Sequence, residues 1–302
     1  MLDTAWPRGL DRQNYATVPF ARPVAHEAGF MKIMSSDDPQ TPTVLTTSPS
    51  TGARGMLELL RTVVVAGAIA IFVRTALFEP FNIPSGSMIP TLQVGDYVWV
   101  AKYSYGYSHF SLPLSPNLFS GRIFGSEPHR GDVAVFRFTK DTSIDYIKRV
   151  VGLPGDRIQM REGQLYLNGE LVPRTSEGEY VAVDEHHTRM EGERYREDLP
   201  GSGGRPAVSH DILKLTDEGD KNDTPEYVVP PGYFFVMGDN RDDSADSRFM
   251  GDAPQDLGFV PMENLVGQAK WIFLSVDAQY PTWEFWKWPT EIRWGRLFSG
   301  VH

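Results

Sequence analysis

An apolar segment at residues 56–78, MLELLRTVVVAGAIAIFVRTALF, sets the strongest limit on how this chain can fold. Its uninterrupted apolar part, residues 62–73, is shorter than the ~20 residues of a spanning helix, but the flanking apolar residues extend it to that length. Arg61 and Arg74 then lie near its two ends, where long cationic side chains reach the lipid headgroups. The segment predicts a single transmembrane helix, although Gly67 and the charges also allow a buried helix of a soluble core.

This helix divides the chain into three parts. Residues 1–54 are rich in Pro, Thr, Ser and Asp and predict a disordered cytoplasmic tail; they lack the pattern of a secretory signal peptide. Residues 55–78 are the predicted helix, and residues 79–302 the predicted folded domain. Arginines flank the amino-terminal end of the helix more than the other end, which weakly favours an extracytoplasmic domain.

The sequence after the helix has the pattern of a mainly β, antiparallel domain. Alternating apolar runs, bounded by Gly, Pro, Asn and Asp, predict strands. These runs lie at residues 93–101, 133–138, 145–151, 157–160, 164–167, 233–237, 260–267 and 268–275. Residues 173–230 are polar and acidic instead, and predict an insertion of weak strands and long loops within the β-rich domain.

Charge and residue content exclude several classes of protein. The net charge of −10 argues against a nucleic-acid-binding protein, because such proteins carry basic patches. The absence of cysteine removes disulfides, thiol nucleophiles and Cys-ligated zinc. The adjacent His186 and His187 would point to opposite faces of an extended chain, which favours a solvated surface over a metal site. The acidic run from Asp242 fails the EF-hand pattern, so we expect no metal and no cofactor.

The carboxyl-terminal tail mixes tryptophans with basic side chains. Its members are Trp283, Trp286, Lys287, Trp288, Arg293, Trp294 and Arg296. This mixture is typical of a segment at a membrane interface. Packing of the tryptophans in the core is the alternative, and the residues alone do not separate the two.

Two segments could supply a nucleophile and a base. Residues 83–92, IPSGSMIPTL, place Ser85 and Ser87 between prolines, which exclude a helix interior or a central strand and predict a rigid loop, here called the serine loop. No histidine lies in a motif that suits a base. Lys148 lies in an otherwise apolar strand, where burial would favour the neutral amine that can activate a serine. The alternating pattern equally allows Lys148 to lie on an exposed strand face.

Four segments together resemble bacterial type I signal peptidase, the family of membrane-bound serine proteases that remove signal peptides from exported proteins. They are residues 84–92, 131–136, 146–156 and 238–248, and their order and spacing agree with the family. The resemblance extends from about residue 78 to 267, apart from the insertion.

The resemblance implies a serine–lysine dyad in which Ser87 attacks the scissile carbonyl and Lys148 takes its proton. The Ser87 N–H and the Ser85 hydroxyl would form the oxyanion hole, and Ser244 would orient the lysine amine. The implied bracing ion pairs are Asp239 with Arg149 and Asp246 with Arg248. The implied shallow apolar pockets, which accept small side chains such as Ala, are lined by Phe81, Ile83, Met88, Leu92, Val135, Tyr146 and Ile147.

The resemblance also implies a setting. The chain would be a single-pass protein of the bacterial inner (plasma) membrane, with its catalytic domain on the periplasmic side, near the protein translocation channel. Its partners would be exported preproteins with signal peptides and membrane lipid. Two alternatives are a self-cleaving Ser–Lys protease of the repressor type and a membrane-anchored β domain that binds partners without chemistry. The hydrophobic anchor and the lack of a DNA-binding module count against the first.

Overall fold

The structure is a computed structural model that describes residues 52–302 except 113–114, 117 and 278–287. Nearly all of the predicted tail, residues 1–54, therefore lies outside the described residues. So do Trp283 and Trp286 of the carboxyl-terminal segment. Trp294 of the same segment is described and is 64% exposed, so this tryptophan does not pack in the core.

Helix α1 (Ala53–Ala76) is the predicted membrane segment. Its span Gly55–Ala76 is long and apolar enough to cross a bilayer, and none of its most apolar window is buried against the rest of the chain. A core helix would bury that surface, so the structure favours the membrane interpretation over the buried-helix alternative. The helix ends earlier than the predicted boundary at residue 78, because Phe78 begins the first strand, β1 (Phe78–Asn82).

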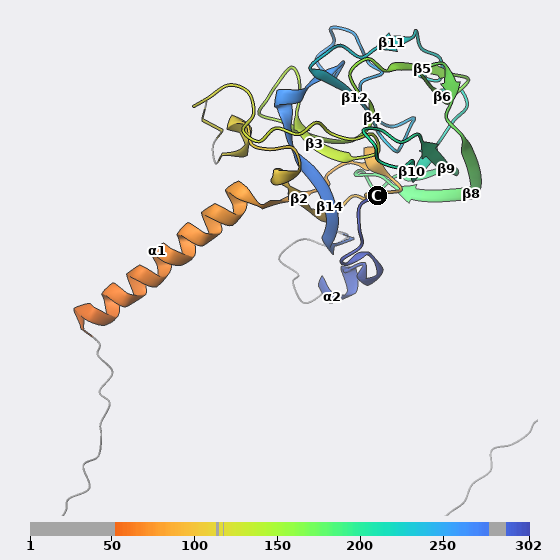
Figure 1. The fold of residues 1–302 in the computed structure, drawn as a ribbon. Helices are drawn as coiled ribbons and strands as arrows, with labels where there is room; N and C mark the ends of the chain where they lie inside the picture. Colours follow the sequence, from red (N-terminus) through yellow and green to blue (C-terminus); the bar gives the residue numbers. More distant parts are fainter. Residues whose placement is uncertain (1–51, 113–114, 117, 278–287) are drawn as a thin grey trace, which may run out of the picture. The chain divides into compact units, whose positions relative to one another are not determined.

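The main sheet has seven strands in the order β1-β2-β14-β3-β4-β12-β13, and all of its pairings are antiparallel (Figure 1). The bounds of the further strands are β2 (Asp96–Ala101), β3 (Val133–Arg137), β4 (Asp145–Gly152), β12 (Tyr233–Met237), β13 (Val260–Pro261) and β14 (Leu265–Ser275). This topology places β4, which carries Lys148, in the interior of the sheet.

Strand β14 corrects the prediction of two strands at residues 260–267 and 268–275. The chain runs through Gly267 without a turn, and the register of β14 on β3 shifts there instead. A Cβ atom at Gly267 would lie 2.7 Å from the Ala101 carbonyl oxygen, so glycine is what allows β14 to approach β2. The extra residue is absorbed as a bulge, and the strand continues to Ser275.

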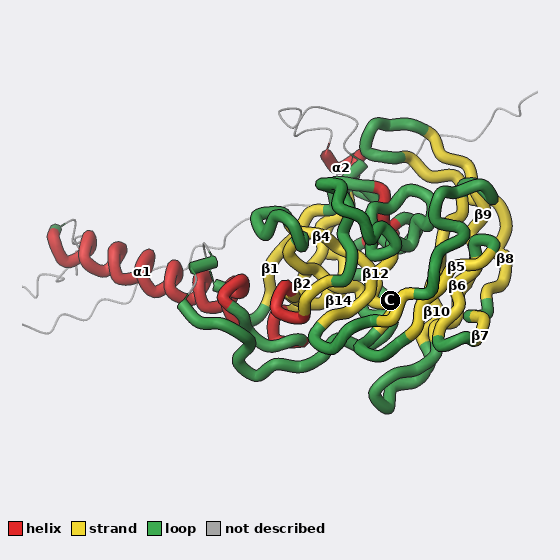
Figure 2. The backbone as a smooth tube through the Cα atoms, turned by 90° about the horizontal axis from the view of Figure 1, so that it is seen from above, coloured by secondary structure: helices red, strands yellow, loops and turns green. Residues whose placement is uncertain are grey.

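Two smaller antiparallel sheets complete the β structure, and strands form most of the regular secondary structure after α1 (Figure 2). One has the order β11-β5-β6-β7 and the other β10-β9-β8. Their bounds are β5 (Arg157–Arg161), β6 (Gln164–Leu167), β7 (Glu170–Leu171), β8 (Arg174–Val183), β9 (Arg189–Leu199), β10 (Val208–Lys214) and β11 (Tyr227–Val228). The mainly β prediction is confirmed. Residues 173–230 form a polar insertion of strands and loops, as expected, but its strands are not weak: β8 and β9 form a hairpin of 10 and 11 residues, with one register shift between Ser176 and Gly178.

The carboxyl-terminal segment returns to the sheet after the short helix α2 (Trp288–Glu291). The Arg296 guanidinium pairs with the fully buried Asp96 at 2.5 Å, and Arg293 donates to the Val94 carbonyl oxygen at 2.9 Å. Arg296 also donates to the Thr91 carbonyl oxygen at 3.0 Å. These bonds fasten the end of the chain to the segment that leads from the serine loop into β2.

One apolar cluster lies beneath the serine loop. Met88 and Leu92 are completely buried in it. Their neighbours in the cluster are Ile83, Val98, Val100, Val133, Val135, Val266, Ala269 and Ile272. Burial of a side chain of this size contributes roughly 1.5–3 kcal/mol, so the two side chains hold the loop firmly against β2, β3 and β14.

Candidate active site

The serine loop connects β1 to β2 and contains a single 3₁₀ turn at Gly86–Met88. Ser85 is extended before the turn, and Ile89 is extended after it. Asn240 holds the turn from the opposite side: its backbone N–H donates to the Ser87 carbonyl oxygen at 3.1 Å, and its amide to the Gly86 carbonyl oxygen at 3.3 Å. The backbone at Ser87 is therefore fixed by the segment that follows β12.

Ser87 and Lys148 meet in this structure. Lys148 Nζ lies 2.6 Å from Ser87 Oγ and 3.2 Å from the carbonyl oxygen of Ile147. The lysine is only 5% exposed and the serine 8%. The alternative in which Lys148 lies on an exposed strand face is therefore wrong, and the amine is available to a single hydroxyl at close range.

Burial changes the acid–base behaviour of the lysine. Desolvation lowers the pKa of the Lys148 amine to about 8, although the carboxylates of Asp246, Asp239 and Asp243 oppose the change by favouring the ammonium form. A substantial fraction of the amine is then neutral at mildly alkaline pH. A neutral amine in contact with a hydroxyl can accept its proton, so this pair can act as nucleophile and base.

Arg149 and Asp239 form a bidentate ion pair next to the lysine. The Nε–Oδ1 and Nη2–Oδ2 distances are both 2.8 Å, and both residues are fully buried. Thr91 Oγ1 donates to the same carboxylate at 2.5 Å, so the pair joins β4 and the end of β12 to the serine loop. Removal of one partner would leave a buried charge without compensation, which typically costs about 3–5 kcal/mol.

Asp246 and Arg248 form a second buried ion pair, also bidentate with two contacts of 2.8 Å. The Asp246 carboxylate additionally accepts the Gly238 N–H at 2.9 Å. Burial alone would raise the pKa of Asp246, but the Arg248 guanidinium and these hydrogen bonds hold it below its usual value. The carboxylate is therefore charged, and it favours the ammonium form of the nearby Lys148.

The expected hydrogen bond between Ser244 and the lysine amine is not formed. Ser244 Oγ is buried and has no hydrogen-bond partner within the described residues. Lys148 bonds to Ser87 and to its own strand instead. A Cβ atom at Gly238 would overlap both Ser244 Oγ and the Ser87 carbonyl oxygen, so Ser244 packs beside the serine loop through a gap that only glycine leaves open.

A cleft of about 370 Å³ opens at the serine–lysine pair. Its walls come from the serine loop, from the start of β4, from the β8–β9 hairpin and from the loop after β12. They are lined by Pro84, Ser85, Gly86, Ser87, Ile144, Asp145, Tyr146, Ile147, Lys148, Glu185, Asp243 and Ala245. Ser85 thus shares the cleft with Ser87. No group of His, Cys, Asp or Glu that could hold a metal ion occurs among the described residues.

The seven side chains expected to line apolar pockets fall into three groups. Tyr146 and Ile147 line the cleft. Phe81 is partly buried and packs against the core cluster. The remaining four, which are Ile83, Met88, Leu92 and Val135, are at most 2% exposed and belong to that cluster. They form the floor beneath the site rather than its walls, because their strand and loop positions face the interior of the sheet.

Sequence reasoning missed Glu185 and Asn240. Glu185 lies at the tip of the β8–β9 hairpin, in the segment interpreted as an insertion, yet its carboxylate accepts the Gly86 N–H at 3.0 Å. Ninety-nine positions separate the two residues. Asn240 lies in the segment 238–248 that carries the family resemblance, so the resemblance could have marked it as a candidate site residue. Nothing in the pattern around Glu185 marked it.

A family model described as "Signal peptidase, peptidase S26" matches residues 56–274 of this chain. The chain belongs to this family. Signal peptidase I of Rickettsia typhi is 37% identical over 251 residues, which cover 78% of this chain and 89% of the relative. Signal peptidase I of Rickettsia akari is 40% identical over 217 residues, 70% of this chain and 77% of the relative. A solved signal peptidase I of Enterococcus faecalis matches at 24% identity with a TM-score of 0.26, over 47% of this chain and 97% of that one, and no conclusion rests on it.

Family membership makes the chain a serine endopeptidase. The matched region begins in α1 and includes Ser87, Lys148 and both buried ion pairs. The alternative of a β domain that only binds partners is therefore wrong. The family matched is that of the signal peptidases, which favours a member of this family over a self-cleaving repressor.

Proposed function

We propose that this chain removes the signal peptides of exported preproteins, with Ser87 as nucleophile and Lys148 as general base. The single observation that carries the proposal is the 2.6 Å contact between Lys148 Nζ and Ser87 Oγ at the floor of an open cleft. The lowered pKa of the amine supports the role of base, and the family assignment supports the class of substrate.

Acylation begins when Ser87 Oγ attacks the carbonyl carbon of the scissile bond and Lys148 Nζ takes the hydroxyl proton. The Ser87 N–H and the Ser85 hydroxyl stabilise the resulting oxyanion, and each such donor typically lowers the barrier by about 3–4 kcal/mol. The carbon–nitrogen bond then breaks, and the Lys148 ammonium gives its proton to the leaving amine. The mature protein departs, and the signal peptide remains as an ester of Ser87.

Deacylation repeats this proton transfer through Lys148, with a water molecule in place of Ser87 as the nucleophile. Neutral Lys148 takes a proton from a water molecule, which attacks the ester carbonyl in the same oxyanion environment. The ester bond breaks, Ser87 Oγ regains its proton from the lysine, and the signal peptide leaves as a carboxylic acid that releases its proton to water. We assign Ser244, the buried hydroxyl beside the serine loop, to orienting the lysine amine during these transfers.

The substrate is proposed to bind as an extended strand. Strand β12 pairs with β4 only at Arg149 and beyond, so on that side the segment from Asp145 to Lys148 has no partner strand among the described residues. β1 is likewise an edge strand. A peptide can add to such free edges by main-chain hydrogen bonds, and Tyr146 and Ile147 then limit the size of the side chains next to the cut.

The end of α1 supports the proposed membrane setting. Tyr107 donates to the Ala76 carbonyl oxygen at 2.6 Å, and Lys102 pairs with Glu79 at 2.8 Å, so the folded domain holds the segment that leaves the helix. Ser87 follows soon after, which supports cleavage close to the surface of the inner membrane. We assign residues 79–302 to the periplasmic side, in contact with lipid and near the translocation channel, where signal peptides emerge.

The purified full-length chain, in detergent micelles, is expected to cut a model preprotein once. Sequencing of the product should give one new amino terminus, directly after a small residue such as Ala at the end of the signal peptide. The same preprotein with a bulky residue at that position should stay intact, because the cleft walls exclude large side chains. Absence of cleavage, or cuts scattered through the mature part, would contradict the proposed function.

A further inference from the structure

The tip of the β8–β9 hairpin is a rigid turn. The Asp184 carboxylate accepts the backbone N–H groups of His186 at 2.8 Å and Thr188 at 2.7 Å. The Asp184 N–H in turn donates to the Thr188 carbonyl oxygen at 3.0 Å. A side chain that closes a turn in this way restricts the backbone, so the residue between these anchors, Glu185, is presented in a defined direction.

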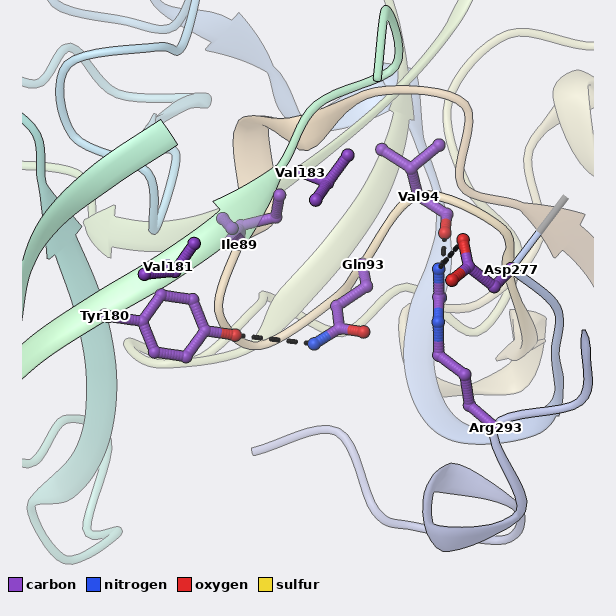
Figure 3. A pocket seen from close by; sticks show the side chains of 9 residues that line it. Ile89, Gln93, Val94, Tyr180, Val181, Val183, Asp277 and Arg293 are labelled. Carbon is purple, nitrogen blue, oxygen red and sulfur yellow. Dashed lines mark hydrogen bonds and ion pairs between the residues drawn. The ribbon is translucent and has the colours of Figure 1, made fainter. Parts of the chain in front are cut away.

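The hairpin is also seated on the serine loop. Ile89 packs in one apolar cluster with Ala182 of β8 and with the partly buried Met190 of β9. Directly after the loop, the Gln93 amide lies 3.4 Å from the Tyr180 hydroxyl, beside a cavity of about 200 Å³ that Ile89, Gln93 and β8 help to line (Figure 3). The hairpin therefore touches the serine loop at Ile89 and the residue after the loop at Gln93, on either side of the cavity, and these contacts hold the tip near Ser87.

At this position, the Glu185 side chain hydrogen-bonds the backbone N–H of Gly86, the residue directly before Ser87. Its Oε2 accepts the Gly86 N–H at 3.0 Å, and its side chain is about one-third exposed in the same cleft as Ser87 and Lys148. Gly86 opens the 3₁₀ turn, where an N–H group has no acceptor inside the turn. Glu185 and Asp243 line the same cleft, and burial together with the Glu185 and Asp184 carboxylates raises the pKa of Asp243.

We infer that Glu185 is a positioning residue for the peptidase reaction: its carboxylate holds the Gly86 amide and so fixes the direction of the Ser87 Oγ and N–H. This inference rests on the proposed function, since it assigns Ser87 the role of nucleophile. Hydrogen bonds to charged acceptors are stronger than neutral ones, and an amide oxygen at the same place still accepts the bond. Glutamine should therefore largely replace the glutamate, and alanine should not.

Glu185→Ala is expected to lower kcat about tenfold, the loss that corresponds to one hydrogen bond to a charged group, with KM changed by less than about twofold. Glu185→Gln should stay within about threefold of the wild-type kcat, because the acceptor remains. Glu191→Ala is the matched control. Glu191 lies on the same hairpin and contacts Arg189 at 2.9 Å, so its loss should leave kcat unchanged.

Hydrogen exchange of the Gly86 amide provides a readout that does not depend on activity. Glu185→Ala should speed this exchange, and Glu191→Ala should not. A wild-type kcat in Glu185→Ala, a higher kcat, or an equal loss in Glu185→Gln and Glu185→Ala would each overturn the inference. If the wild-type chain fails to cut preproteins, the proposed function fails, whereas the Gly86 exchange still tests the contact by itself.

Discussion

Replacement of Ser87 by alanine is expected to abolish preprotein cleavage and to leave the fold intact. The substitution removes only the hydroxyl oxygen that contacts Lys148 at 2.6 Å, while Met88 and Leu92 continue to anchor the loop in the core. Loss of the nucleophile of a serine protease lowers kcat on the order of 10⁶-fold. The measurement is the rate of preprotein cleavage, followed by gel shift or mass spectrometry, with thermal unfolding recorded in parallel.

Ser126→Ala is a suitable control for this variant, because Ser126 is an exposed serine in the loop before β3. It should cleave at the wild-type rate. Cleavage by Ser87→Ala within tenfold of that rate, with an unchanged unfolding temperature, would mean that another group is the nucleophile.

Replacement of Lys148 by methionine is expected to have an effect of comparable size. Methionine replaces the apolar stem of the lysine with an unbranched side chain of similar length, so most of the buried site stays filled, but it supplies no base. General acid–base catalysis contributes about 10²–10⁴-fold, and its loss is larger where base and nucleophile act as a unit. We therefore expect cleavage to fall by about 10⁴-fold or more, measured in single-turnover experiments that separate chemistry from product release.

Lys140→Met controls for the loss of a lysine elsewhere. Lys140 is exposed, and within the described part of the chain its amine bonds to the backbone carbonyl oxygens of Gly251 and Ala253, after β12. This variant should be fully active. If Lys148→Met kept more than about a tenth of the wild-type rate, general-base catalysis by the lysine would be excluded, because loss of a general base typically lowers the rate by about 10²-fold or more.

The strands that could be predicted are those whose buried side chains leave an apolar run or an apolar alternation in the sequence. Strands β3 and β12 are buried at all but one residue each, β4 is buried from Lys148 onward, and the three ranges agree with the prediction to within a residue or two. Strand β8 buries one residue, Ala182, and its other nine are exposed or half-buried. A strand with little buried surface has no alternation of apolar residues. The sequence of the hairpin that covers the serine loop therefore predicts an insertion of weak strands and long loops.

The candidate site divides in the same way. Ser87 and Lys148 could be predicted because each stands in a local pattern that suits its chemistry, and the pair then needed only the fold to bring them together. Glu185 could not, because its contact with Gly86 depends on how a polar hairpin docks 99 positions away. The sequence also does not show how deeply a side chain is buried. Met88 and Leu92 are apolar residues near Ser87, and only the packing of the fold shows that they lie in the core.

The pH dependence of kcat/KM, measured together with the ionisation of Lys148 by NMR of its labelled amine, tests the serine–lysine dyad most directly. Burial lowers the pKa of the amine to about 8, and only the neutral amine is a base, so activity should rise with pH up to that value and level off above it. Below it, kcat/KM should fall about tenfold per pH unit, and the amine resonance should titrate over the same range. Activity that stays constant through mild acid, or a Lys148 amine that titrates near its ordinary value of 10.5 in a fully active enzyme, would contradict the dyad.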